Sequence, residues 1–256
     1  MNHNFIDRYA GIDSLIHRLD PRTKLVTTLG FVLAVNLTPI QRWPAFALYF
    51  ALIAVVIGLS RLPILFVLRR SLVIIPFVFF IAVFNLFFKQ GEQMAGFDVF
   101  GWHLSITREG LDIFSSVMAK ACLSILGLIL LSSTTALPRL LKGLEQLGLP
   151  RVLVMILSFM YRYLFVLADE VLRMKQARDS RSFGARRMGQ IKTVGNMIGT
   201  LFIRSYERAE RVYAAMLARG FEGRMVTSSR LRLRLADVHY AATFSIAVLA
   251  IALFPY

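Results

Sequence analysis

Arginines stand at two places where helices are predicted to end, and their side chains are suited to molecular recognition. A guanidinium group stays charged and makes several directed hydrogen bonds through a planar fork. Arg178 and Arg181 form one cluster and Arg219 forms the other, with a glycine shortly after each. Such groups dock into carboxylate or carbonyl sites on another protein. The candidate residues of both clusters are Ala177, Arg178, Arg181, Ala218, Arg219 and Gly220.

Two amphipathic helices must position these arginines. Steps of three and four residues place side chains on one face of a helix. Apolar side chains follow this spacing until Arg178 and Arg181 continue the first series and Arg219 continues the second. A stripe this narrow suits packing against another helix more than burial in a broad core. The two stripes are Met160, Leu164, Leu167, Val171 and Met174, and Ile198, Phe202, Ser205, Ala209, Val212 and Met216.

The same pattern has an ordinary structural explanation, which stays open. Arginine near a helix C-terminus interacts favourably with the helix dipole, and glycine just beyond it is a common cap. That explanation is sufficient for a single helix. The arrangement occurs twice, about forty residues apart, in a segment without catalytic groups. The repetition favours two helices presented to a partner protein.

Other residue types that could carry chemistry are scattered. None of the four histidines has a second ligand at a helical spacing, and the single cysteine, Cys122, lies in an apolar run; neither feature predicts a metal site. The segment from Gly184 to Gly189 has the glycine spacing of a phosphate-binding loop. Lys192 comes two places late for that motif, and no strand is predicted before it. We therefore expect no catalytic group, metal or cofactor in this chain.

The composition predicts a membrane protein with a basic aqueous face. The 256 residues are 57% hydrophobic and carry a formal net charge of +15, and the mean hydropathy is +0.62. A nucleic-acid-binding protein would carry such a basic surface on a soluble fold, so we expect no nucleic-acid partner.

Five apolar runs predict membrane spans. The stretch 150–168 is also apolar enough to be a span, but a crossing there would place the basic linker after it outside the cell. We therefore expect this stretch to lie along or shallowly in the membrane. Residues 138–235 hold 19 of the 30 lysines and arginines, which predicts that they and the N-terminus face the cytoplasm. Asp20 and Pro21 predict the start of the first span, and Lys120, inside the fourth, is expected to face the bundle or the interface. The runs are 24–37, 43–59, 72–88, 111–131 and 238–254.

Three motifs resemble the transmembrane T component of energy-coupling-factor (ECF) ABC transporters, and the match is closest to the cobalt-type CbiQ family. They are Leu19-Asp20-Pro21-Arg22-Thr23-Lys24-Leu25, Leu147-Gly148-Leu149-Pro150, and Arg204-Ser205-Tyr206-Glu207-Arg208-Ala209-Glu210-Arg211 leading to Ala215-Met216-Leu217-Ala218-Arg219-Gly220-Phe221-Glu222-Gly223.

The resemblance implies a fold and a set of partners. The fold is an all-α membrane protein, with about five transmembrane helices and a cytoplasmic or interfacial domain of two to three coupling helices. The domains are a four-span membrane domain at 1–133, a coupling-helix domain at 134–235 and a last span at 236–256. The partners are two ATPase (A component) subunits, which bind the ATP, a membrane S component that captures substrate, a small accessory membrane subunit and the lipid bilayer.

The resemblance also implies roles for the arginine clusters. Ala218-Arg219-Gly220 is the second Ala-Arg-Gly type motif, and Ala177-Arg178 is the first, with Asp179 in place of glycine. That departure leaves Arg178 and Arg181 as alternative anchors. The implied function is a non-enzymatic subunit of an importer in the cell membrane, for cobalt or nickel. The alternatives are a T component of a vitamin transporter, a membrane-anchored basic scaffold that binds anionic lipid or a protein, and, least favoured, a membrane enzyme.

Overall fold

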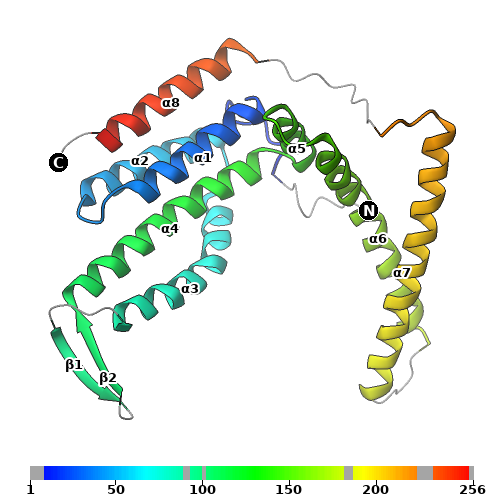
Figure 1. Cartoon of the computed structure of the whole chain (residues 1–256), viewed down its shortest axis with the longest axis horizontal. Helices are drawn as coiled ribbons and strands as arrows, with labels where there is room; N and C mark the ends of the chain where they lie inside the picture. The colour runs from blue at the N-terminus through cyan, green and yellow to red at the C-terminus, as the bar shows by residue number, and fades with distance from the viewer. Residues whose placement is uncertain (1–8, 89–92, 100–101, 182–186, 224–232, 254–256) are drawn as a thin grey trace. The chain divides into compact units, whose positions relative to one another are not determined.

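The computed structural model describes residues 9–88, 93–99, 102–181, 187–223 and 233–253. The chain divides into two compact units. We call Asn4–Gly143 with Leu231–Tyr256 the bundle unit, and Leu144–Arg230 the amphipathic unit. In chain order (Figure 1) the elements are α1 Pro21–Leu37, α2 Trp43–Ser60, α3 Ile64–Phe88, β1 Gln93–Val99, β2 Trp102–Thr107, α4 Arg108–Thr134, α5 Leu137–Gln146, α6 Arg151–Asp179, α7 Arg187–Ala218 and α8 Leu235–Leu253.

The predicted start of α1 is confirmed. The Asp20 carboxylate accepts a hydrogen bond from the backbone N–H of Arg22 at 2.9 Å, and Pro21 occupies the first helical position. Proline is tolerated there because the first N–H groups of a helix have no intrahelical partner. The helix has 17 residues, and at about 1.5 Å per residue it is shorter than a hydrocarbon layer of about 30 Å.

The core of the bundle unit is built around Phe31 of α1. Its side chain is 1% exposed and meets Tyr49 of α2 edge-on, with ring centroids 5.8 Å apart. Phe244 of α8 lies on another side, with centroids 6.1 Å apart. Gly127 brings α4 close as well, because a Cβ there would lie 3.4 Å from the Phe31 ring. One aromatic side chain therefore joins four helices.

α1 and α8 lie side by side and run in the same direction (Figure 1). At one end, the backbone N–H of Asp20 donates to Oδ1 of Asp237 at 2.8 Å. At the other end, the Arg42 guanidinium donates to the carbonyl of Ala252 at 3.0 Å. Helices that start at the same end cross a membrane in the same sense, as the predicted topology requires.

α3 begins earlier than predicted. The helix starts at Ile64, so Arg69 and Arg70 lie inside it instead of preceding it. Pro76 lies in its middle, and Figure 1 shows the helix bent. Proline removes a backbone hydrogen bond and its ring crowds the preceding turn, which explains the bend.

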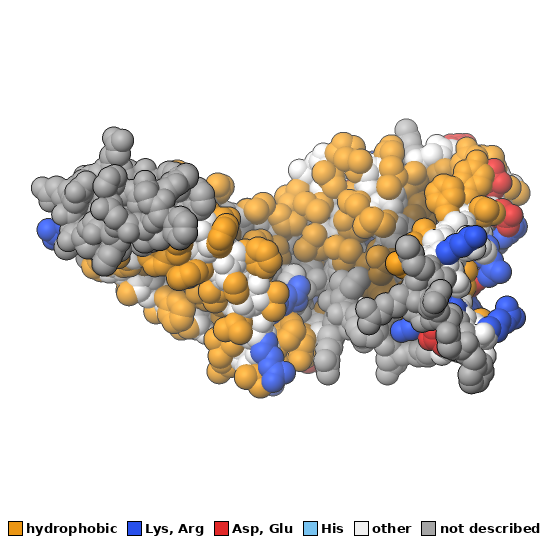
Figure 2. Space-filling view, turned by 90° about the horizontal axis from the view of Figure 1, so that it is seen from below, with side chains coloured by type: hydrophobic (Ala, Val, Ile, Leu, Met, Phe, Trp, Pro, Cys, Tyr) orange, Lys and Arg blue, Asp and Glu red, His pale blue; other side chains and the backbone are white. Residues whose placement is uncertain are grey.

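Within the described ranges, five helices are long and apolar enough to span a membrane: α2, α3, α4, α6 and α8. The chain is therefore a multi-pass membrane protein by composition, as predicted. The set differs from the predicted runs, because α6 is included and the shorter α1 is not. On the face drawn in Figure 2, hydrophobic side chains cover much of the described surface, as a surface in contact with lipid requires. Lys120 donates to the carbonyl of Asn36 at 3.0 Å, so it faces the bundle.

The polar segment 89–109 contains structure that its composition did not predict. β1 and β2 pair antiparallel, with Val99 opposite Trp102 and Gly96 opposite Ser105. The segment is therefore a hairpin between α3 and α4, not only a loop. α7 starts at Arg187, well before Ile198, the first residue of its predicted stripe. These differences leave the all-α membrane class unchanged.

Candidate functional site

α6 and α7 form an apolar groove within the amphipathic unit. The groove has a volume of about 400 Å³, and both predicted stripes contribute to it. Met160 and Leu167 of the first stripe and four residues of the second line the same space. The spacing predicted packing against another helix, but not that the two stripes face one another. The lining residues are Ile156, Phe159, Met160, Tyr163 and Leu167 of α6, and Ser205, Arg208, Ala209, Val212 and Met216 of α7.

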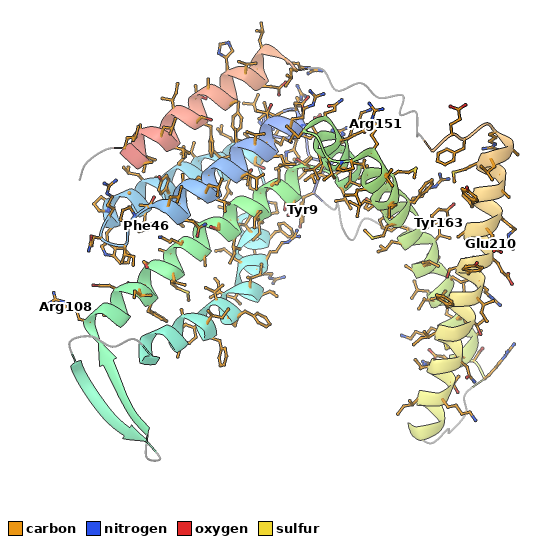
Figure 3. The ribbon with its side chains drawn as sticks, in the orientation of Figure 1. Tyr9, Phe46, Arg108, Arg151, Tyr163 and Glu210 are labelled. Carbon is orange, nitrogen blue, oxygen red and sulfur yellow. The ribbon has the colours of Figure 1, made fainter. Side chains whose placement is uncertain are left out.

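Several side chains of the stripes are exposed in the isolated chain. Met160 is 53% exposed on α6, and Phe202 is 70% exposed on α7. Figure 3 shows Tyr163 projecting from α6 beside α7. Met160 lines the groove, whereas Phe202 lies outside its lining. Large exposed apolar side chains of this kind mark a surface that lipid or another apolar partner covers.

Glu170 connects the two helices on their polar side. Its carboxylate accepts from Arg173 on the same helix at 3.1 Å and from Arg204 on α7 at 2.5 Å. The pair with Arg173 has the three-residue spacing of neighbours on one helix, whereas the bond to Arg204 joins two helices. Arg204 is separated from Glu170 by 34 residues, so no helical spacing reveals the contact.

Arg178 lies in the last turn of α6. Its Nε and Nη2 atoms donate to Oδ1 of Asp179 at 2.9 and 2.7 Å. The Arg178 side chain is 26% exposed and that of Asp179 is 52% exposed. Asp179, the residue that departs from the family pattern, therefore holds the guanidinium in the unbound chain.

Arg219 follows the last residue of α7 in a defined helix cap. The N–H of Phe221 donates to the carbonyl of Met216, and the N–H of Gly220 donates to that of Leu217. These two bonds form a Schellman cap, which needs a left-handed residue. Gly220 supplies it, with φ of 78°. The Arg219 side chain is exposed, and no described residue forms an ion pair with it.

The structure groups the predicted residues at two separate places. Ala177, Arg178 and Arg181 lie at the end of α6, whereas Ala218, Arg219 and Gly220 lie at the end of α7. α6 and α7 run in opposite directions (Figure 1). The two arginine clusters therefore occupy opposite ends of the helix pair. Arg181 lies in the turn after α6 and is exposed.

Three groove residues of α6 were missed by sequence reasoning. Ile156, Phe159 and Tyr163 line the groove beside the predicted stripe. A signal was available, because Ile156 precedes Met160 by four residues and Tyr163 precedes Leu167 by four. The apolar face is thus wider than a single stripe.

Among the residues that the structure describes, no three or more histidine, cysteine, aspartate or glutamate side chains are grouped as metal ligands. The candidate site therefore consists of a guanidinium cluster at the end of each helix, with Arg178 half-buried and Arg181 and Arg219 exposed, and of an apolar groove between the helices.

Comparison with known proteins identifies the family of this chain. Residues 13–229 match the model of the CbiQ cobalt transport protein family. The chain is 30% identical to the energy-coupling factor transporter transmembrane protein EcfT of Listeria innocua, over 99% of this chain and 98% of that protein. It is 29% identical to an uncharacterized protein of Methanocaldococcus jannaschii over 98% of this chain and 86% of that protein, and 28% identical to EcfT of Lactococcus lactis over 87% and 86%. This chain is therefore a member of the CbiQ family of cobalt transport proteins.

Proposed function

We propose that this chain is the energy-coupling transmembrane subunit of an ECF-type ABC importer. In this role it carries no catalytic group. It passes the ATP-driven motion of two separate ATPase subunits to a membrane S component that holds the substrate. The observation that carries the proposal is the pair of antiparallel helices whose ends present Arg178 and Arg219. Family membership and the names of the EcfT relatives support the same role.

The opposite placement of the clusters supports two docking sites. Each end of the α6–α7 pair presents one arginine cluster, so each can enter a groove on a different ATPase subunit. The unit that carries both clusters then moves as the ATPases approach and separate. In this arrangement the N-terminus and the amphipathic unit face the cytoplasm, where ATP is available.

Cobalt is the substrate that we propose, with nickel as the close alternative. The proposal rests on the family description. The S component selects the ligand, so a vitamin remains the other candidate. Measuring uptake of Co²⁺, Ni²⁺ and vitamins by cells with and without the chain decides among them.

The proposed docking predicts the effect of removing the guanidinium groups. Arg219→Ala and Arg178→Ala remove charged hydrogen-bond donors that a partner would bury. Truncating one member of such a pair typically costs about 2–5 kcal/mol, so ATPase binding should weaken by about thirtyfold or more. Purification in mild detergent measures how much ATPase stays bound, and a cell assay measures uptake.

Arg211→Ala is the matched control. Arg211 lies on α7, is 69% exposed and pairs with Glu207 on its own helix at 3.7 Å. Its removal should leave ATPase binding unchanged. Normal uptake by the Arg178→Ala, Arg219→Ala double variant contradicts the proposal.

Arg219→Lys separates protein docking from binding to anionic lipid. Lysine keeps the charge but lacks the planar fork. A basic surface that only attracts anionic lipid tolerates this change, because each charge contributes about equally. Docking into a groove does not, so the lysine variant should lose ATPase binding almost as completely as the alanine variant.

A further inference from the structure

α5, the helix that leads from the bundle unit to the amphipathic unit, packs closely against the start of α1 at a glycine. α5 carries Leu141, which is 3% exposed, and Gly143, which is buried. A Cβ added at Gly143 would lie 3.2 Å from Cβ of Pro21 and 3.4 Å from the backbone nitrogen of Arg22. Both neighbours belong to the rigid start of a helix, so they cannot rotate away as a long side chain can.

The start of α1 is itself fixed by two buried carboxylates. Asp20 is 6% exposed and Asp237 is 2% exposed. Oδ1 of Asp237 accepts from the N–H of Asp20 at 2.8 Å, and its Oδ2 accepts from the N–H of Arg234 at 2.7 Å. One side chain therefore ties the first turn of α8 to the first turn of α1. Buried groups with these partners are costly to separate.

Lys24 extends this connection to the α4–α5 junction. Its ammonium group, on a residue 5% exposed, donates to the carbonyl of Thr134 at 3.0 Å, to Oγ1 of Thr135 at 3.3 Å and to the carbonyl of His17 at 3.3 Å. An ammonium group has three protons to donate, and all three have acceptors. Thr134 ends α4 and Thr135 begins the link to α5, so Lys24 holds the base of α5 in place.

The boundary between the two units lies just after this contact of α5 with α1. The bundle unit ends at Gly143 and the amphipathic unit begins at Leu144. α5 then closes in a glycine cap: the N–H of Leu149 donates to the carbonyl of Leu144, and Gly148 has φ of 106°. Pro150 precedes α6 and lacks an N–H with which to continue the helix.

We infer that Gly143 and Lys24 are positioning residues that hold α5 fixed on the bundle unit during transport, so that the amphipathic unit moves about Leu147–Pro150. The inference rests on the proposed function, because it assigns the fixed and the moving parts of the coupling subunit. The motif from Leu19 to Lys24 then has three structural roles: it caps α1, contacts α5 and holds the α4–α5 junction in place.

The test uses the complex of this chain with its co-purifying ATPase and S component in liposomes. We compare Gly143→Val with the wild type and measure ATP hydrolysis and accumulation of Co²⁺, or of Ni²⁺ if the wild type accumulates only that ion. A displaced α5 should leave ATPase binding and hydrolysis in place, while ions accumulated per ATP fall about fivefold or more. This ratio separates a positioning role from a general loss of stability, which lowers both quantities together.

Gly127→Ala is the matched control. Gly127 also lies at a helix contact in the bundle unit: a Cβ added there would lie 3.4 Å from the Phe31 ring, and its three nearest atoms all belong to α1. This variant should keep the wild-type ratio. The same ratio in Gly143→Val as in wild type overturns the inference. A wild-type chain that binds no ATPase contradicts the proposed function instead, so the two failures are distinguishable.

A second measurement does not depend on the valine variant folding. Pro21→Cys and Gly143→Cys, with Cys122→Ser, place two thiols where the Cβ atoms lie 3.2 Å apart, close to the range of about 3.5–4.5 Å that disulfides need. Oxidation should cross-link them and leave ions accumulated per ATP within about twofold of the reduced protein. Loss of accumulation on oxidation with recovery on reduction overturns the inference, as does failure of the two thiols to cross-link.

Discussion

His17 is a buried titratable group whose hydrogen bonds are satisfied by the neutral ring. Its Nδ1 lies 2.7 Å from Oγ of Ser14 and its Nε2 lies 3.1 Å from the carbonyl of Tyr9. A neutral ring that carries its proton on Nε2 satisfies both contacts, since the Ser14 hydroxyl then donates to Nδ1. Burial lowers the pKa of His17 below its usual 6.5, and the positive charge of Lys24 lowers it further.

This pKa shift predicts that acid destabilises the folded state. Because the folded state binds the proton less readily than the unfolded state, the contribution of His17 to the free energy of unfolding is fully present above about pH 6.5 and falls as the pH drops below it. Thermal unfolding in detergent at pH 7.5 and 5.5 measures the loss. His17→Gln should reduce the difference between the two values. His239→Gln, at an exposed position, should leave the difference unchanged, and an equal effect of both substitutions contradicts the assignment to His17.

At the scale of elements, the end of α7 depends on one backbone conformation. Gly220 has φ of 78°, in the left-handed region that costs a residue with a Cβ about 1 kcal/mol. Gly220→Ala should therefore loosen the cap on which Arg219 stands. Amide hydrogen exchange should show the N–H groups of Gly220 and Phe221 exchanging about fivefold faster.

A glycine elsewhere on α7 gives the opposite prediction. Gly199 lies inside the helix, and nothing lies within 4 Å of an added Cβ. Gly199→Ala should stabilise the helix by about 0.8–1 kcal/mol, since alanine has the higher helix propensity. If both substitutions shift exchange in the same direction, backbone conformation is not what distinguishes the two sites.

Elements with local signals were predictable from the sequence. The stripes on α6 and α7 repeat every three or four residues, and Asp20 with Pro21 marks a helix start. Each of these signals lies within one continuous segment, so it could be identified without knowing the fold. The contact of Glu170 with Arg204 and that of Asp20 with Asp237 depend on packing between distant segments. Gly143 gave no signal, because its importance comes from the approach of α1.

At the scale of the whole molecule, the apolar half of α6 decides the topology. α6 is long and apolar enough to span a membrane, yet only 6% of its most apolar stretch is buried within the chain. A helix in that condition is covered by lipid or by a partner. We predict that it lies along the membrane, because crossing would carry the basic segment after it to the outside.

Cysteine labelling of intact cells tests this topology. On a Cys122→Ser background, Gln176→Cys and Glu222→Cys should react only after a reagent enters the cytoplasm. Gln41→Cys, in the turn between α1 and α2, should react with an impermeant reagent from outside. Reaction of Glu222→Cys from outside shows that α6 crosses, and the proposed orientation of the amphipathic unit is then wrong.

The bond between Asp20 and Asp237 has a consequence for biogenesis. The two residues are 217 positions apart, and at about 5–20 residues per second the ribosome needs roughly ten to forty seconds to make the stretch between them. Until α8 emerges, Phe31 lacks the ring of Phe244 and the N–H of Asp20 lacks its acceptor. A stalled or truncated nascent chain therefore lacks these contacts between α1 and α8 in the bilayer. Their absence distinguishes it from the mature protein for the proteases and chaperones of membrane quality control.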